Sequence, residues 1–170
     1  MTSSFDHVHL YAADLAAAIA FYVDVLGGER IGRLPSGGRG DNHLLLLGGQ
    51  FLVVSAFPEG IAPAPPADVG DGALTHGFGV AHLGLNVSDL DATLARLRSA
   101  GVHIHSEPRA NSALRFVYFS APDGVVIELT QYTLPRHLKP LAGVANAINW
   151  GIHRVRRGLG RQLVGKGGRG

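Results

Sequence analysis

The sequence predicts an α+β fold built from two related modules, each ordered as a strand, a helix and three strands. The main observation is an internal repeat, because Asp6–Gly27 is similar to Ala81–Gly101 at a constant offset of 75 residues. In this repeat His7 corresponds to His82, and each copy reads as a strand followed by an amphipathic helix. Two copies are too few for a solenoid. We therefore expect a duplicated module whose halves pack together.

The composition favours one compact domain, or two small modules that share a core. Of the 170 residues, 46% are hydrophobic and 16% are charged, which leaves ample material for a buried interior. The chain has no cysteine, which excludes disulfides, thiolate metal sites and a cysteine nucleophile. The first residues do not resemble a signal peptide, and no run reaches the roughly 20 apolar residues of a membrane span. We therefore expect a cytoplasmic protein.

The net charge of +2 is unevenly distributed along the chain. Residues 1–134 hold all 13 Asp and Glu with seven Lys and Arg, a net charge of −6. Residues 135–170 hold the other eight Lys and Arg and no acidic residue. The chain is thus a mildly acidic body with a basic tail, which gives no reason to expect nucleic-acid binding.

The first module covers residues 1–57. Asp14 is a typical helix N-cap, apolar residues follow it at helical spacing, and Gly27-Gly28 ends the helix. The expected strands are Phe5–Tyr11, Glu29–Leu34, His43–Leu47 and Phe51–Phe57, of which the last two form a hairpin.

Residues 58–78 are rich in Pro, Gly and Ala and are expected to be a linker to a second module at residues 79–134. The order of elements repeats there, with a Pro-Asp-Gly turn before the last strand. The expected elements are strand Gly79–Val87, helix Leu90–Ala100 and strands Val102–Ser106, Phe116–Ser120 and Val125–Gln131, with a loop at Glu107–Leu114.

Residues 135–170 form a basic, amphipathic C-terminal extension. Apolar residues recur there at three- and four-residue spacing, and most arginines lie off this stripe. The stripe consists of Leu141, Val144, Ile148, Ile152, Val155, Leu159 and Leu163. Four glycines weaken the helix by about 1 kcal/mol each relative to Ala, so it needs a surface to lie on. An anionic membrane could supply that surface, but the glycines favour a second subunit, and we expect a homodimer.

Three residues carry the expected chemistry: His7 and His82, at matched strand positions, and Glu128 on the last strand of the second module. Alternation along that strand places Glu128 on one face with Val126 and Thr130. Two imidazoles and one carboxylate form the facial set that leaves open positions on a divalent metal. Taken singly, each is more often a hydrogen-bonded or solvent-facing residue. The duplication is what favours ligation.

Three stretches carry a family resemblance: DHVHLYAADL with FYVDVLGGE, then AHLGLNVSDLDATLARLRSAGV, then FVYFSAPDGVVIEL. Over roughly residues 5–132 the chain resembles the vicinal oxygen chelate superfamily. That superfamily includes glyoxalases, extradiol dioxygenases, bleomycin and fosfomycin resistance proteins and methylmalonyl-CoA epimerases. The resemblance implies two βαβββ modules whose curled sheets form an open cup. It also implies a small substrate chelated through adjacent oxygens to a metal held by His7, His82 and Glu128.

Departures from the family pattern narrow the reaction. A glyoxalase I has a fourth ligand where this chain has Val53 or Val54, so the resemblance disfavours that enzyme. The ligand set is most like that of an extradiol dioxygenase, which implies Fe(II) or Mn(II), with Zn(II) or Ni(II) as alternatives. Tyr118 is then a catalytic hydrogen-bond donor, or else an ordinary strand aromatic. The loop before Val117 lacks the proton-relay histidine of extradiol enzymes, which argues against ring cleavage without excluding oxygen binding.

Further residues are expected to enter the cup. His9 shares the strand face of His7 and is expected to contact the substrate or to act in acid–base catalysis, with an ordinary hydrogen-bonded polar residue as the equal alternative. The expected substrate contacts are Tyr11, Phe51, Arg109, Ser112 and Phe116, and the expected apolar lining also includes Leu45 and Leu47. His76 is the alternative ligand if the strand register at His82 differs.

Two other functions stay open. A metal-free member of the superfamily would hold a ligand in the cup, as bleomycin resistance proteins do. A fosfomycin-type transferase or lyase would bind a phosphonate through basic residues, for which Arg109 and Arg115 are candidates, although solvated loop charges are their more common role. The three candidate ligands favour the metal-dependent enzyme.

Overall fold

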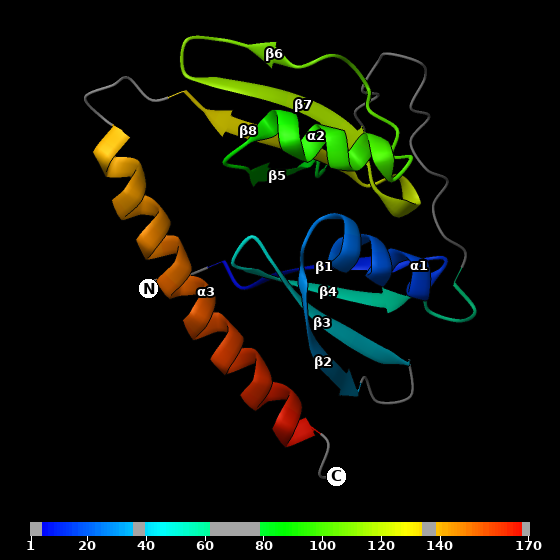
Figure 1. Ribbon diagram of the computed structural model, residues 1–170. Helices are drawn as coiled ribbons and strands as arrows, with labels where there is room; N and C mark the ends of the chain where they lie inside the picture. Colours follow the sequence, from blue (N-terminus) through cyan, green and yellow to red (C-terminus); the bar gives the residue numbers. More distant parts are fainter. Residues whose placement is uncertain (1–4, 36–39, 62–78, 134–138, 168–170) are drawn as a thin grey trace. The chain divides into compact units, whose positions relative to one another are not determined.

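The computed structural model describes residues 5–35, 40–61, 79–133 and 139–167. The chain forms two compact units, Met1–Pro63 with Gly143–Gly170 and Ala64–Ala142, and each unit contains one four-stranded sheet (Figure 1). The predicted α+β class is confirmed. Residues 62–78, which include His76 and most of the expected linker, lie outside the described residues.

The sheet of the first unit has the strand order β1-β4-β3-β2. Its elements are β1 (His7–Ala12), α1 (Leu15–Ala20), the π-helical turn η1 (Phe21–Val25), β2 (Glu29–Pro35), β3 (Asp41–Leu47) and β4 (Gln50–Ala56). Asp14 is the N-cap of α1, as predicted, and its Oδ1 accepts a hydrogen bond from the Ala17 amide at 2.9 Å. Gly27, which follows the helical segment, has a φ of +75° that favours glycine.

The two faces of this sheet differ in the residues they bury. In the β3–β4 register Leu44 pairs with Val53, so Leu44 lies on the same face of the sheet as Val53 and Phe51. Leu45 and Leu47 lie on the other face, which α1 covers. The prediction that Leu45 and Leu47 line a cup with Phe51 is therefore wrong. A run of four leucines has no alternation to reveal its phase, so only the hairpin register decides which leucine faces which side.

The sheet of the second unit has the strand order β5-β8-β7-β6. Its elements are β5 (Leu83–Asn86), α2 (Leu90–Ser99), β6 (Arg109–Ala110), β7 (Leu114–Ser120), the 3₁₀ turn η2 (Pro122–Gly124) and β8 (Val126–Tyr132). Asp89 caps α2 as Asp14 caps α1, because its Oδ1 accepts a hydrogen bond from the Ala92 amide at 2.9 Å. The repeat found in the sequence is thus a repeat of capping chemistry as well.

The predicted strand Val102–Ser106 is wrong at this length. The segment forms one isolated bridge, Ile104 with Phe119, and pairing resumes only at β6, inside the predicted loop. Pro108 lies between the two and has no N–H to continue the ladder. The first strand of this module is also shorter than predicted, so that His82 lies just before β5.

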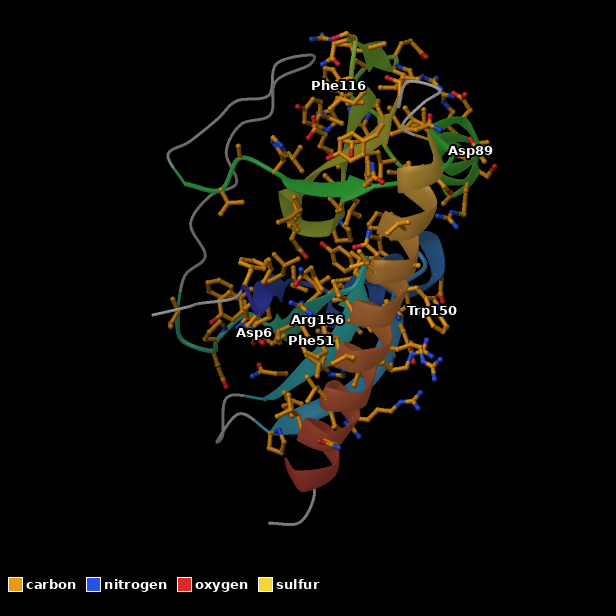
Figure 2. All side chains as sticks on the ribbon, turned by 90° about the vertical axis from the view of Figure 1, so that its left-hand side faces the viewer. Asp6, Phe51, Asp89, Phe116, Trp150 and Arg156 are labelled. Atoms are coloured by element: carbon orange, nitrogen blue, oxygen red, sulfur yellow. The ribbon has the colours of Figure 1, made fainter. Side chains whose placement is uncertain are left out.

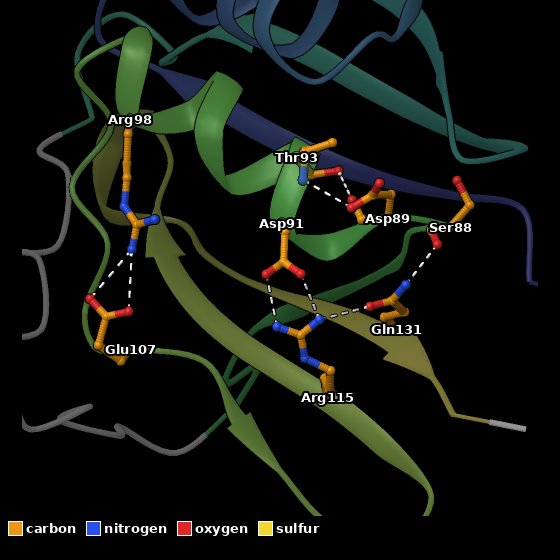
Figure 3. Close-up of polar contacts among 9 residues, drawn as sticks. Ser88, Asp89, Asp91, Thr93, Arg98, Glu107, Arg115 and Gln131 are labelled. Carbon is orange, nitrogen blue, oxygen red and sulfur yellow. Dashed lines mark hydrogen bonds and ion pairs between the residues drawn. The ribbon is translucent and has the colours of Figure 1, made fainter.

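A polar network attaches α2 to its sheet (Figure 3). The Arg115 guanidinium on β7 donates two hydrogen bonds to the Asp91 carboxylate on α2, at 2.8 and 2.9 Å, and the Gln131 amide donates one to the Ser88 carbonyl at 2.7 Å. Arg115 holds the pKa of Asp91 below its usual value by this hydrogen bonding. Arg115 and Tyr118 lie on opposite faces of β7, which excludes Arg115 from a phosphonate site on the Tyr118 face.

The C-terminal helix α3 (Lys139–Gly167) lies against the sheet of the first unit (Figures 1 and 2). A Cβ placed on Gly160 would lie 2.9 Å from side-chain carbons of Ile31 and Phe51, and one on Gly32 would lie 2.5 Å from Val164 Cγ1. Glycine is therefore what allows the helix and the sheet to approach this closely. Among the described helices, none combines the length and the apolar character that a bilayer span requires.

Candidate functional site

Glu128 is the centre of a polar cluster on the second unit, which we call the Glu128 cluster (His82, Tyr118 and Glu128). Ile127 and Leu129 are almost completely buried, so the alternation along β8 turns Glu128 to the opposite face, as predicted. Tyr118 is the direct partner of Glu128 in the β7–β8 register, and its hydroxyl donates a hydrogen bond to Glu128 Oε1 at 2.7 Å. His82 Nε2 lies 3.4 Å from the other oxygen, Oε2.

The surroundings of Tyr118 in the Glu128 cluster keep its hydroxyl protonated, so that it remains a hydrogen-bond donor. Burial raises the pKa of Tyr118, and the hydrogen bond to Glu128 and its charge raise it further, while Arg109 opposes the shift. The cluster remains open to a ligand, since the side chains of His82 and Glu128 keep 32% and 19% of their surface exposed. His82 Nδ1 is buried without a hydrogen-bond partner among the described residues.

Gly84 is a part of this site that sequence reasoning missed. It is the register partner of Glu128 in the β5–β8 pair, and a Cβ placed on it would meet nothing within 4 Å. The strand thus leaves open space beside the carboxylate. A lone glycine inside the strand LGLN was the available signal, because glycine weakens a strand and often marks a place where another group approaches closely.

The Glu128 cluster fits two ligands of a divalent metal. Two ligand atoms at about 2.1 Å from one ion lie roughly 3.0–3.4 Å apart at angles between 90° and 110°. The 3.4 Å between His82 Nε2 and Glu128 Oε2 agrees with this separation. Tyr118 holds the second carboxylate oxygen, as hydrogen-bonding groups behind metal ligands commonly do. Within either unit, the described residues bring no three potential metal ligands of the His, Cys, Asp or Glu type together.

The two histidines of β1, His7 and His9, belong to the first unit and differ in their partners. His7 Nδ1 lies 2.8 Å from Asp6 Oδ2, which leaves Nε2 as the nitrogen for a further ligand. His9 Nε2 lies 2.7 Å from the hydroxyl oxygen of the buried Ser55. Burial lowers the pKa of His9, and His7 lowers it further. The ring of Tyr11, next on this face, packs against His9 with centroids 4.9 Å apart.

The remaining predicted substrate residues have different surroundings. Phe51 is only 6% exposed and packs under α3 beside Arg156 (Figure 2). Phe116 shares the Tyr118 face, with ring centroids 5.9 Å apart. Arg109 pairs with Phe116 through the backbone at the sheet edge, and Ser112 is exposed in the turn before β7. The structure thus gathers Phe116 near the Glu128 cluster and gives Phe51 a packing role.

A hollow on the second unit lies at a different place from the Glu128 cluster. Its lining includes Arg98, His103, Ser106 and Glu107, none of which was predicted as a site residue. Arg98 and Glu107 pair with each other across 3.4 Å (Figure 3). Surface shape alone therefore does not lead to the Glu128 cluster.

Comparisons with known proteins identify the family of this chain. The family described as the Glyoxalase/Bleomycin resistance protein/Dioxygenase superfamily matches residues 4–129. The uncharacterized protein YaeR of Escherichia coli (strain K12) is 32% identical over 130 residues, which cover 72% of this chain and 92% of YaeR.

Solved structures show the same fold. TnmS3, an antibiotic binding protein from Streptomyces sp. CB03234, is 26% identical with a TM-score of 0.58 over 78% of this chain and 98% of its own. The fosfomycin resistance protein FosX from Listeria monocytogenes is 19% identical with a TM-score of 0.57 over 79% of this chain and 97% of its own. With the family match extending over both sheets, the chain belongs to the Glyoxalase/Bleomycin resistance protein/Dioxygenase superfamily.

Proposed function

We propose that this protein is a divalent-metal-dependent enzyme that acts on a small substrate chelated through adjacent oxygens. The superfamily includes enzymes and non-enzymatic members, and its enzymes commonly use divalent metal ions. The proposed ligands are His82 and Glu128 of the second unit with His7 of the first. The set is most like that of an extradiol dioxygenase, which favours Fe(II) or Mn(II) over Zn(II) or Ni(II).

This proposal rests mainly on the different partners of the two oxygens of the Glu128 carboxylate. One oxygen accepts the Tyr118 hydroxyl at 2.7 Å, and the other faces His82 Nε2 at 3.4 Å. A carboxylate with no such role would more simply point to water, because a charge that is four-fifths buried loses hydration. A metal held by Glu128 and His82 would balance the charge of the carboxylate and act as a Lewis acid on the substrate oxygens.

The residues of the chain itself prepare this chemistry. Tyr118 fixes the rotamer of Glu128 and stays protonated, since its pKa is raised. Asp6 orients His7 through Nδ1 and thereby selects Nε2 as the ligand atom. His9, whose lowered pKa keeps it neutral near pH 7, can accept a proton from a bound substrate. Phe116 supplies an apolar contact beside the Glu128 cluster.

The test is metal binding by calorimetry and mass spectrometry on anaerobically purified protein. We expect about one Fe(II) or Mn(II) per chain, and a loss of affinity well beyond tenfold in Glu128→Gln and in His82→Gln. Glu107→Gln is the matched control, because Glu107 is a carboxylate of the same unit with 86% of its side chain exposed. Absence of bound metal in the reconstituted wild type, or equal affinity in Glu128→Gln, would contradict the proposal.

A metal-free ligand-binding protein is the second candidate. The 26% identity to TnmS3, whose description is an antibiotic binding protein, is the observation that favours it. A fosfomycin-type transferase or lyase has weaker support, because Arg115 is paired with Asp91 on the other face and Arg109 alone stays available. Tight binding of an antibiotic that is unchanged by a chelator and by Glu128→Gln would establish the binding protein instead.

A further inference from the structure

The helix α3 faces its own sheet with the side opposite to the one expected from its amphipathic pattern. In a typical surface helix the apolar stripe packs on the core and the charged face meets water. Here Arg157 Nη2 lies 2.5 Å from Glu29 Oε2, and Arg161 Nη2 lies 3.3 Å from Glu29 Oε1. Arg156 donates hydrogen bonds to the backbone carbonyls of Phe5 and Asp6 and to the Gln50 side chain (Figure 2).

The apolar stripe of α3 is consequently left uncovered. Each of its described side chains has between 44% and 63% of its surface exposed. We call these six residues the α3 stripe; they are Val144, Ile148, Ile152, Val155, Leu159 and Leu163. The stripe extends about 28 Å along the helix, at 1.5 Å per residue, and none of its members is charged. An apolar band of this size on a soluble unit marks an interaction surface.

The spacing of the six residues of the α3 stripe is symmetric about its midpoint; Leu141, which continues the apolar pattern three residues earlier in the sequence, lies outside this symmetric set. Reading from either end, the intervals are four, four, three, four and four residues. Two copies laid antiparallel would therefore place Val144 against Leu163 of the other copy, Ile148 against Leu159, and Ile152 against Val155, with no gap in the contact. A twofold axis at the centre of the stripe generates this pairing, and a patch that is complementary to itself is what a twofold dimer requires.

The charges favour this antiparallel pairing over a parallel one and over a membrane. The helix arginines all lie in its second half, at positions 154, 156, 157 and 161, so a parallel pair would bring like charges together. Three of them are also engaged with the first unit's own sheet, and Arg154 stacks on Trp150 at 4.7 Å. A helix that binds anionic lipid would instead present its cations beside the apolar stripe.

We propose that the α3 stripe is the interface with a second copy of this chain, paired antiparallel about a twofold axis. Half-exposed aliphatic side chains of this kind have on the order of 80 Å² each to lose, so twelve of them would bury on the order of 1,000 Å², the size at which stable interfaces begin. The proposal is independent of the metal, because none of the proposed ligands lies on α3.

The first test measures the oligomeric state of the full chain by sedimentation velocity over a range of concentrations. We expect twice the mass of one chain for the wild type, and association at least about 100-fold weaker in Ile152→Asp and in Leu159→Asp, because each would bury an unpaired carboxylate. Ala147→Asp, at an exposed position off the stripe, is the matched control and should remain dimeric. Helical circular dichroism verifies that each variant folds.

A monomeric wild type, or a dimer that survives both stripe variants, would overturn the proposal. Co-flotation of the wild type with phosphatidylglycerol vesicles at low salt, lost in Ile152→Asp while the free protein stays monomeric, would overturn it in favour of a lipid surface.

The second test determines the direction of pairing. Because the chain has no cysteine, the introduced cysteines are its only thiols. Val144→Cys chains mixed with Leu163→Cys chains should form a mixed disulfide under mild oxidation, whereas Val144→Cys alone should not cross-link. Cross-linking of Val144→Cys with itself would show a parallel pair and overturn the antiparallel assignment.

Discussion

The two units contain the same module, yet equivalent positions on its last two strands carry apolar side chains in the first unit and polar side chains in the second. The pairing registers make the comparison residue by residue: His9 pairs with Val53 in the first unit, and Gly84 pairs with Glu128 in the second. Both pairs are related by the 75-residue offset of the repeat. On the adjacent strand, Leu44 is opposite Val53 where Tyr118 is opposite Glu128.

These exchanges give β3 and β4 an apolar surface and leave polar side chains at the equivalent positions of β7 and β8. In the first unit, Leu44, Leu46, Phe51 and Val53 form an apolar cluster that Val164 of α3 covers. In the second unit, the equivalent face carries a carboxylate and a phenol that bond to each other. A duplicated fold can thus place an apolar cluster at one copy of these positions and a hydrogen-bonded carboxylate at the other.

The largest expected effect comes from exchanging the two residues at the equivalent position. Val53→Glu would place an unpaired carboxylate under α3, at a site only 7% exposed, and should lower the free energy of unfolding by about 3–5 kcal/mol. Glu128→Val, its counterpart in the second unit, should change the free energy of unfolding by less than about 1 kcal/mol while it removes metal binding. Urea unfolding measures both. Equal destabilisation by the two variants would break the comparison.

The next largest effect should come from removing one tyrosine hydroxyl, which we expect to change metal affinity in the second unit and not in the first. Tyr118→Phe deletes the donor that holds Glu128, so we expect metal affinity to fall by about 10- to 100-fold. Tyr11→Phe deletes a hydroxyl from an aromatic residue of the first unit, whose ring packs on His9 and Phe57, and should leave metal affinity within about twofold. Calorimetric titration gives both values. An unchanged affinity in Tyr118→Phe would mean that Glu128 needs no orientation.

Substitution of two glycines of α3 tests which face of this helix the sheet covers. Gly160→Ala would push a methyl group to within 2.9 Å of Ile31 and Phe51 and should destabilise the protein by about 1–2 kcal/mol. Gly158→Ala has open space and should stabilise it by up to about 1 kcal/mol through helix propensity. Thermal unfolding of the two variants should therefore shift in opposite directions. Shifts of the same sign would mean that α3 is not seated on the sheet as described.

The smallest expected effect is a dependence of stability on pH. Burial lowers the pKa of His43, with Arg30 and Arg33 adding to the shift, and burial with His103 lowers the pKa of His105. Because the unfolded state binds these protons first, stability is complete above about pH 6.5 and falls as the pH drops from there toward the folded-state values. His43→Gln and His105→Gln should each flatten this slope in their own unit. Chemical denaturation at pH 7.5 and 5.5 measures it.

Much of the architecture could be predicted because local chemistry decides it. Asp14 caps its helix as expected, Asp89 at the matched position of the repeat caps the second helix in the same way, and the alternation around Glu128 correctly predicts its face. The errors arise where a distant partner decides. The run of leucines on β3 has no phase until β4 pairs with it, and the segment at Ile104 loses its strand pairing where Pro108 interrupts it.

The candidate site was predictable to the extent that one strand defines it. Glu128 and Tyr118 follow from the strand pattern, but their mutual hydrogen bond depends on the β7–β8 register. The stripe of α3 was visible in the sequence, yet its outward direction depends on Glu29, more than 100 residues earlier, which attracts the arginines. Gly160 counted against the helix in a propensity argument, whereas in the structure it is the contact point.

The attachment of α3 also has a consequence for how the protein is made. Arg156 binds Gln50 and Asp6, which lie 106 and 150 positions earlier in the chain. At a synthesis rate of about 5–20 residues per second, the apolar cluster on β3 and β4 waits roughly 5–20 s for its cover to leave the ribosome. The second unit emerges complete during that interval. The first unit to be translated is therefore the last to be finished, and its uncovered face is the surface that a chaperone would meet.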